Sequence, residues 1–258
     1  MTSRPNTAQI AAIVDEAALS GTAIAQFTAQ FEFNVDEAYA VQTQSIDRRL
    51  ARGERLVGVK MGLTSRAKMA QVGVDQVIWG RLTDAMIVTE GAPLSIGRFV
   101  HPRVEPEVAF LIGASLAGNV TIAEAMSAVE GVAPAAEIID SRYQNFQFAL
   151  ADVIADNSSS SGFVVGPWAS PEVDISNLAM VLSVDGRPAQ IGSSAAILGN
   201  PLRSLVEAAR AAASAGLTLE PGWIVLAGGA TAAEPLAVGS TYRVDVESLG
   251  SVAFSVTA

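Results

Sequence analysis

Two patterns of hydrophobic and polar positions divide this chain of 258 residues. In the first part, apolar residues recur at helical spacing over residues 6–19, and Asn34 with Glu37 forms a capping-box pattern ahead of a second helix over about 35–52. Residues 55–62 then read as a short apolar strand. This part is therefore expected to be rich in helix, with one or two strands.

Thr64 is a suitable N-cap for a further short helix over about 65–72, which Gly73 would end. After Asp84 the pattern changes to short runs rich in β-branched residues, which are typical of strands. These runs cover residues 86–91, 103–113, 131–140, 148–155, 162–166, 179–186, 223–228, 241–248 and 251–258.

Two helices interrupt these strands. One begins at Thr121, where Glu124 completes a second capping box, and the other covers about 200–215. Residues 184–188 have the composition of a hairpin turn. So many strands with so few helices predict an α+β fold with a mixed, largely antiparallel sheet core. We expect a helix-rich region over 1–84 and a β-rich catalytic region over 85–258.

The composition excludes several kinds of chemistry. The chain has 16 basic and 26 acidic residues, one histidine (His101) and no cysteine. It therefore cannot build a thiolate zinc site or a multi-histidine metal site, and its net charge of −10 argues against nucleic acid as a partner. No apolar run is long enough to span a membrane and no export signal is evident, so we expect a cytoplasmic protein. Its high apolar content favours a homo-oligomer.

Glu105 and Glu107 lie two residues apart in an apolar strand, so both side chains point to the same face. A solvated strand face would explain them, and so would a divalent cation that relieves their repulsion. Glu137 lies in the next strand, beyond one helix, where the two strands could pair. Three carboxylates favour Mg²⁺ or Mn²⁺. Asp140 is a competing ligand, with a salt bridge to Arg142 as its alternative role.

Lys60 is one of only two lysines and follows an apolar stretch, so we expect it to be at least partly buried and paired with an acid or a bound anion. The other, Lys68, reads as a solvated charge. Asp156 precedes a run of serines, which either holds a substrate carboxylate or forms a plain turn. The Gly-rich loop at 228–231 either lets the backbone approach a ligand closely or forms a tight turn. His101 is expected to be structural.

In this order, the motifs resemble the hydratase/decarboxylase branch of the fumarylacetoacetate hydrolase superfamily. The resemblance extends from about residue 5 to the end of the chain. It is carried by residues 59–69 (VKMGLTSRAKM), 79–82 (WGRL), 105–107 (EPE), 136–138 (AEI), 156–161 (DNSSSS) and 227–231 (AGGAT).

The resemblance implies a Mg²⁺ or Mn²⁺ site at the three glutamates, catalytic roles for Lys60 and Asp156, and no organic cofactor. The substrate-binding candidates are Met61, Gly62, Ser160, Ser161 and Thr231, and Leu63 and Val74 are further apolar neighbours of the site. Within the branch, residues 60–62, 77–80 and 228–233 favour the decarboxylases. That activity is the conversion of 2-oxo-3-hexenedioate, a 2-oxo dicarboxylate of catechol meta-cleavage pathways, to 2-hydroxypenta-2,4-dienoate.

Three alternatives remain open on the sequence. The first is a hydratase that acts on 2-hydroxypenta-2,4-dienoate, and a complex with such a hydratase is also plausible. The second is a C–C hydrolase of diketo acids, which would need a base such as His101. The third is a non-catalytic protein that binds 2-oxo acids.

Overall fold

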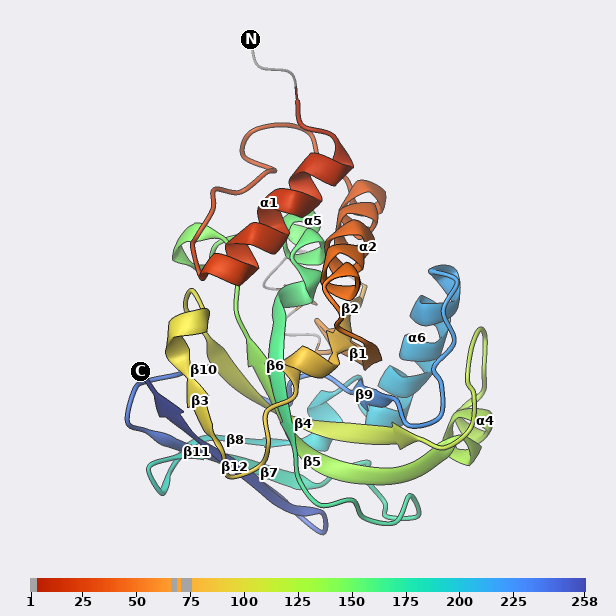
Figure 1. Cartoon of the computed structure of the whole chain (residues 1–258). Coiled ribbons are helices and arrows are strands. Elements are labelled where there is room, and N and C mark those ends of the chain that lie inside the picture. The colour runs from red at the N-terminus through yellow and green to blue at the C-terminus, as the bar shows by residue number, and fades with distance from the viewer. Residues whose placement is uncertain (1–3, 66–68, 71–75) are drawn as a thin grey trace.

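Two β-sheets form the core of the computed structural model, which describes residues 4–65, 69–70 and 76–258 (Figure 1). In the seven-stranded sheet, every neighbouring pair is antiparallel except β1 with β9. Its strands, in spatial order, are β2 (Ile78–Thr83), β1 (Leu56–Gly62), β9 (Ile224–Leu226), β4 (Arg103–Ile112), β5 (Val129–Ile139) and β6 (Ser160–Val165), with β10 (Glu234–Pro235) paired to β4.

The five-stranded sheet packs against the first sheet through apolar side chains such as Phe110 and Val132 on one side and Val244 and Phe254 on the other. Among the described strands of this second sheet, β3 and β12 pair in parallel and the other neighbours are antiparallel. Its strands, in spatial order, are β3 (Pro93–Ser95), β12 (Gly250–Thr257), β11 (Thr241–Val246), β7 (Ala179–Val184) and β8 (Arg187–Ser193). The predicted α+β fold with a mixed, largely antiparallel sheet core is confirmed.

Three helices lie together on the side of the large sheet that faces away from the five-stranded sheet (Figure 1). They are α1 (Thr7–Ser20), α2 (Val35–Ala51) and α5 (Leu150–Ala155). The capping box predicted at Asn34 is present, and Asn6 forms another at the start of α1. Asp15, buried on α1, forms ion pairs with Arg48 and Arg52, which fasten α2 to α1.

Two further helices were expected where they occur. Thr121 caps α4 (Ile122–Ser127) with Glu124, and Asn200 caps α6 (Pro201–Ser214). The chain reverses direction in the connection that contains α4, and β4 and β5 pair antiparallel. The helix expected over 65–72, with Lys68 and Val74 nearby, lies largely outside the described residues.

The strand expected at 148–155 was wrong, because residues Leu150–Ala155 form α5. The carboxylate of Asp152 accepts the backbone N–H of Ala149, a helix-capping bond, and also binds the N–H groups of Phe27 and Thr28. The apolar positions Leu150, Val153 and Ile154 fit helical spacing as well as they fit a strand. Contacts from a distant segment therefore decide between the two.

The strand expected at 86–91 is also absent. Asp84–Met86 form a single 3₁₀ turn, and Ile87 makes one isolated bridge to Phe163. This segment carries the chain from the large sheet at β2 to the small sheet at β3, so it cannot follow either ladder for long. Strand β8 was not predicted, although the turn at 184–188 that precedes it was, and Asp185 and Gly186 have the positive φ of a tight hairpin turn.

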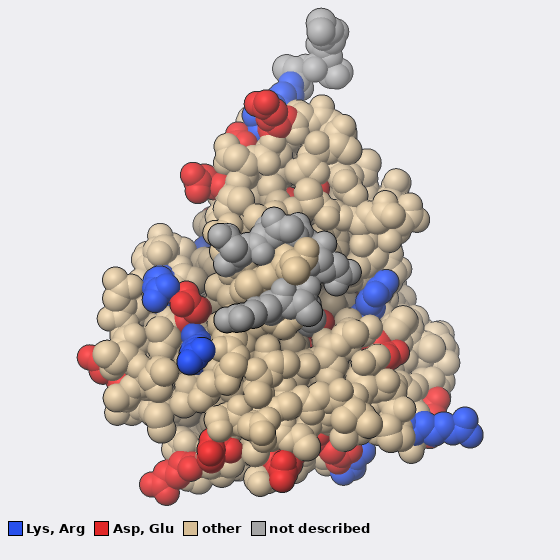
Figure 2. All heavy atoms as spheres, turned by 180° about the vertical axis from the view of Figure 1, so that it is seen from behind, with Lys and Arg blue, Asp and Glu red and all other residues tan. Residues whose placement is uncertain are grey.

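β1 and β2 belong to the same sheet as β4 and β5, so the expected N-terminal region contributes two strands to the sheet that carries the glutamates. The division at residue 84 stays a prediction. On the face shown in Figure 2, charged side chains are sparse and most of the visible surface is uncharged. None of the helices in the described part of the chain is long and apolar enough to cross a membrane.

Candidate metal and substrate site

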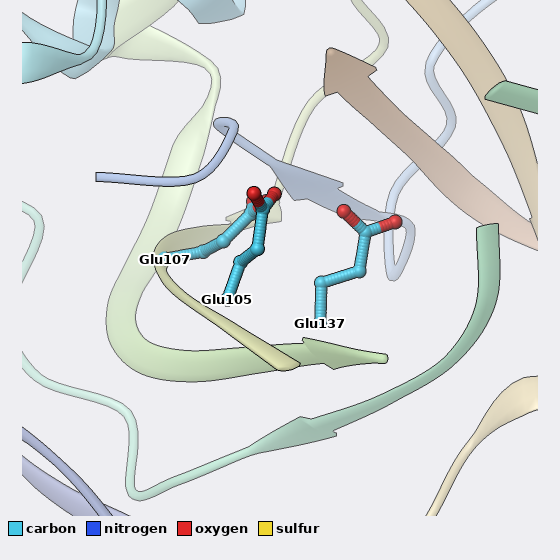
Figure 3. A group of neighbouring side chains, drawn as sticks. All are labelled: Glu105, Glu107 and Glu137. Carbon is cyan, nitrogen blue, oxygen red and sulfur yellow. The ribbon is translucent and has the colours of Figure 1, made fainter. Parts of the chain in front are cut away.

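Three glutamates meet on one face of the large sheet (Figure 3). Glu105 of β4 lies directly opposite Glu137 of β5, and Glu107 follows two residues later on the same face. Each of the three offers a carboxylate oxygen, and these oxygens all lie within 4.8 Å of one another. The alternative of a solvated strand face is wrong, because all three side chains are buried.

The glutamate triad is electrostatically unfavourable without a cation. Burial raises the pKa of Glu107 well above its ordinary value, and the charge of Glu137 raises it further. Burial also raises the pKa of Glu137. Glu107 Oε1 and Glu137 Oε1 are buried and accept no hydrogen bond from any described residue. Unsatisfied, oxygen-only ligands at this spacing fit a hard divalent cation such as Mg²⁺, Mn²⁺ or Ca²⁺.

Lys60 shares this face of the sheet, as strand register shows. Lys60 pairs with Leu226 of β9, which pairs in turn with Ala109 of β4, two residues beyond Glu107. Lys60 Nζ lies 3.0 Å from Glu137 Oε2 and donates a hydrogen bond of 3.0 Å to the carbonyl of Ser158. The expectation of a buried lysine paired with an acid is confirmed.

The ammonium of Lys60 stays charged despite its burial. Desolvation lowers the pKa of Lys60, but attraction to Glu137, Glu107 and Glu105 outweighs it and leaves the pKa above its ordinary value. With one ammonium against three carboxylates, the site lacks two positive charges. A bound divalent cation would make it neutral before an anionic substrate enters.

The glycine-rich loop at 228–231 closes one side of the site. Gly228 N–H donates a 2.7 Å hydrogen bond to Glu107 Oε2. Gly228 has φ +109°, and a Cβ there would lie 2.2 Å from Thr64 Oγ1, so only glycine fits this position. Sequence reasoning named this loop but not its contact with a glutamate, because a backbone donor has no signature in the sequence.

Asp156 is buried and forms an ion pair with Arg142, whose guanidinium also donates to Ser161 Oγ. Burial raises the pKa of Asp156 to about 6, although Arg142 lowers it. The salt bridge proposed between Asp140 and Arg142 was wrong. Asp140 instead accepts the N–H groups of Val100 and His101, and it is not among the clustered metal-ligand candidates of the described chain.

The other substrate-binding candidates lie at different positions relative to the glutamates. Met61 is the neighbour of Lys60 in β1, so its side chain points to the sheet face opposite the glutamates. There it lies within the main core, as does Trp79, its partner in β2. A Cβ on Gly62 would lie 3.6 Å from Lys60 Nζ, which places Gly62 beside the site. Ser160 Oγ contacts Met86 Sδ at 3.9 Å, and Thr231 Oγ1 donates to its neighbour's carbonyl. Their substrate contacts stay predictions.

His101 stands outside the glutamate cluster, and its ring packs 5.2 Å from that of Phe146. This agrees with the structural role expected for it. Sequence reasoning missed two groups that do touch named site residues, the guanidinium of Arg142 and the carbonyl of Ser158. Arg142 was named from the sequence only as a partner for Asp140, and its position two residues after that acid was the available signal.

Residues 59–257 match the model of the fumarylacetoacetate (FAA) hydrolase C-terminal family. The chain therefore belongs to the fumarylacetoacetate hydrolase family, as its motifs predicted.

Among its relatives, 4-oxalocrotonate decarboxylase of Pseudomonas sp. is 57% identical over 249 residues, which cover 96% of this chain and 97% of that protein. The structure of 4-oxalocrotonate decarboxylase from Pseudomonas putida G7 in complex with magnesium and adipate matches with a TM-score of 0.94 and 37% identity, over 99% of both chains. A 2-keto-4-pentenoate hydratase of Paraburkholderia xenovorans (strain LB400) is 35% identical over 241 residues, which cover 92% of this chain and 90% of the hydratase.

Proposed function

We propose that the protein is a metal-dependent carboxy-lyase that converts 2-oxo-3-hexenedioate, also called 4-oxalocrotonate, to 2-hydroxypenta-2,4-dienoate and CO₂. One observation carries the proposal. A buried triad of glutamates with unsatisfied oxygens, beside a buried lysine, occurs in a chain that is 57% identical to a 4-oxalocrotonate decarboxylase over nearly its whole length.

Mg²⁺ or Mn²⁺ is the cofactor that the triad would hold, through Glu105, Glu107 and Glu137. The match to a structure in complex with magnesium and adipate supports this assignment, since adipate is a six-carbon dicarboxylate like the proposed substrate. When bound, the cation would be chelated by the 2-oxo acid end of the substrate and would supply Lewis-acid stabilisation of the negative charge that develops on the C2 oxygen.

The chain's own residues would act on the rest of the substrate. During the reaction the C5–C6 bond breaks and C6 leaves as CO₂. The bonding electrons move through the conjugated system to the C2 oxygen, which takes a proton from solvent. Lys60 would neutralise the distal carboxylate or orient the intermediate. Because tight binding of that carboxylate would oppose CO₂ loss, Lys60 must favour the transition state over the ground state.

The remaining assignments concern residues around the substrate. Asp156 would act in catalysis, held by Arg142, and Ser160 and Ser161 would bind the C1 end. Met61, Gly62 and Thr231 are the other substrate-binding candidates, of which Met61 would have to act through its backbone because its side chain lies on the far face.

The substrate-consumption assay separates this proposal from its rivals. With Mg²⁺ and 2-oxo-3-hexenedioate, we expect CO₂ release in stoichiometric amount with loss of the enedioate absorbance. Formation of 4-hydroxy-2-oxopentanoate from 2-hydroxypenta-2,4-dienoate, without CO₂ release from the dicarboxylate, would instead identify the hydratase. Binding of either compound without turnover would identify a non-catalytic protein.

Partners and location are the last part of the proposal. A homo-oligomer, a complex with the hydratase that consumes the product, and a cytoplasmic location all remain predictions. The match to a hydratase of 35% identity supports only a shared substrate chemistry.

A further inference from the structure

A left-handed turn links α5 to β6. Asn157, Ser158 and Ser159 have φ of +49°, +52° and +61°. Residues with a side chain adopt this conformation infrequently and usually one at a time, since Cβ then approaches the following carbonyl oxygen. Three in succession form a strained turn, which persists only where surrounding contacts hold it.

The side chains of the turn make their contacts with β2, while the backbone N–H of Asp140 also donates to the carbonyl of Ser159 at 2.8 Å. Asn157 Oδ1 accepts the backbone N–H of Arg81 at 2.8 Å, and Asn157 Nδ2 donates to the carbonyl of Arg81 at 2.9 Å. The Asn157 side chain thus pairs with β2 as a neighbouring strand would. Ser158 Oγ donates to the carbonyl of Trp79 at 2.7 Å. Gly80 allows this approach, because a Cβ there would lie 2.4 Å from the carbonyl oxygen of Asn157.

The turn directs one backbone carbonyl at the catalytic lysine. The carbonyl oxygen of Ser158 accepts the Lys60 ammonium at 3.0 Å, and Glu137 Oε2 lies 3.0 Å from the same nitrogen. An ordinary right-handed turn would point this carbonyl elsewhere. The ammonium is therefore held between a backbone oxygen and one glutamate of the triad.

We propose that Asn157 is a positioning residue, which pins the left-handed turn to β2 so that the carbonyl of Ser158 holds Lys60 in its working position. The catalytic consequence rests on the proposed function. The placement of Lys60 does not, since it follows from the contacts alone.

A double-mutant cycle between Asn157→Ala and Lys60→Met tests the proposal. With Lys60 present, Asn157→Ala should lower kcat at least tenfold and change KM less than threefold. In the Lys60→Met background the same substitution should change the residual kcat less than twofold. An equal loss in both backgrounds would show a general structural role and overturn the proposal, as would a kcat within twofold of wild type for Asn157→Ala.

The dissociation constant for Mn²⁺ supplies the same cycle without turnover. Asn157→Ala should change it at least threefold when Lys60 is present and less than 1.5-fold in Lys60→Met. If the wild-type protein releases no CO₂, the proposed function fails, and this titration alone decides the positioning role. Equal changes in both backgrounds would contradict it.

Two further variants guard against misfolding. Asn157→Gly adopts the left-handed φ readily but loses both bonds to Arg81, so it replaces Asn157→Ala in the cycle if that variant does not fold. Ser159→Gly is the matched control. It relieves strain at φ +61° and removes a hydroxyl that has no hydrogen-bond partner in the described structure, so kcat should stay within twofold of wild type. A tenfold loss in this control would contradict the assignment to Asn157.

Discussion

Three buried carboxylates and one ammonium form a site that is stable only when its charge is compensated. Glu107 and Glu137 both have raised pKa values, and burial is the first cause for each. A single unit charge about 4 Å away is worth about 4 kcal/mol at an effective dielectric constant of about 20. The residue-scale chemistry therefore couples protons to the metal, because a proton on a glutamate and a divalent cation compete for the same oxygens.

At this scale we predict that metal binding releases protons. Since the pKa of Glu107 is raised, the apoprotein keeps a proton there at pH values where a free glutamate has lost it. Metal affinity should therefore rise with pH until that proton is gone. Titration calorimetry with Mn²⁺ in two buffers of different ionisation enthalpy measures the released protons, and Glu107→Gln serves as the comparison. Affinity that is independent of pH would contradict the prediction.

At the scale of elements, α5 depends on a single carboxylate. Asp152 is fully buried and accepts hydrogen bonds from the N–H groups of Phe27, Thr28 and Ala149. It therefore caps α5 and ties the segment after α1 to it. Asp156 and the left-handed turn follow directly after this short helix, so its stability also supports the site.

We predict that Asp152→Ala lowers the free energy of unfolding by about 3–5 kcal/mol, because one buried and two partly buried N–H groups lose a charged acceptor at once. Urea denaturation followed by circular dichroism measures the change. Asp174→Ala is the matched control, since Asp174 also accepts a backbone N–H, from Ser176, but at an exposed turn. Its loss should stay below about 1 kcal/mol. Equal losses in the two variants would refute a special role for Asp152.

At the scale of the whole molecule, the chain has few charged residues and exposes several large apolar side chains. Ile191, Val238 and Leu19 are exposed by 74%, 58% and 55%. Only 16% of the residues are charged, against about 25% in typical soluble domains. Large exposed apolar side chains in a chain with few charges favour association with further copies or partners.

We therefore predict that the protein is a homo-oligomer. Sedimentation equilibrium at micromolar concentration should give a mass that is a multiple of 26.6 kDa. The net charge of −10 opposes association, so the assembly should tighten as salt screens that repulsion. A single species of 26.6 kDa at all salt concentrations would contradict the prediction.

Much of the fold and the centre of the site followed from local rules. Capping pairs such as Asn34 with Glu37 mark helix starts because they satisfy backbone groups within one turn. The two-residue period of a strand places Glu105 and Glu107 on one face, and the strand–helix–strand order of the sequence allowed the strand of Glu137 to pair with theirs. A lysine within an apolar strand is buried wherever that strand is buried.

Other features were decided only by tertiary structure, because they depend on groups far apart in sequence. Within the expected strand at 148–155, residues Leu150–Ala155 form a helix, and Asp152 in that helix accepts hydrogen bonds from Phe27 and Thr28. Arg142 forms its ion pair with Asp156, whereas both carboxylate oxygens of Asp140 accept backbone N–H groups. The carbonyl of Ser158 meets Lys60 because long-range contacts, those with β2 among them, hold a left-handed turn in place. Sequence by itself determined which residues share a face, and tertiary contacts decided which partner each buried charge received.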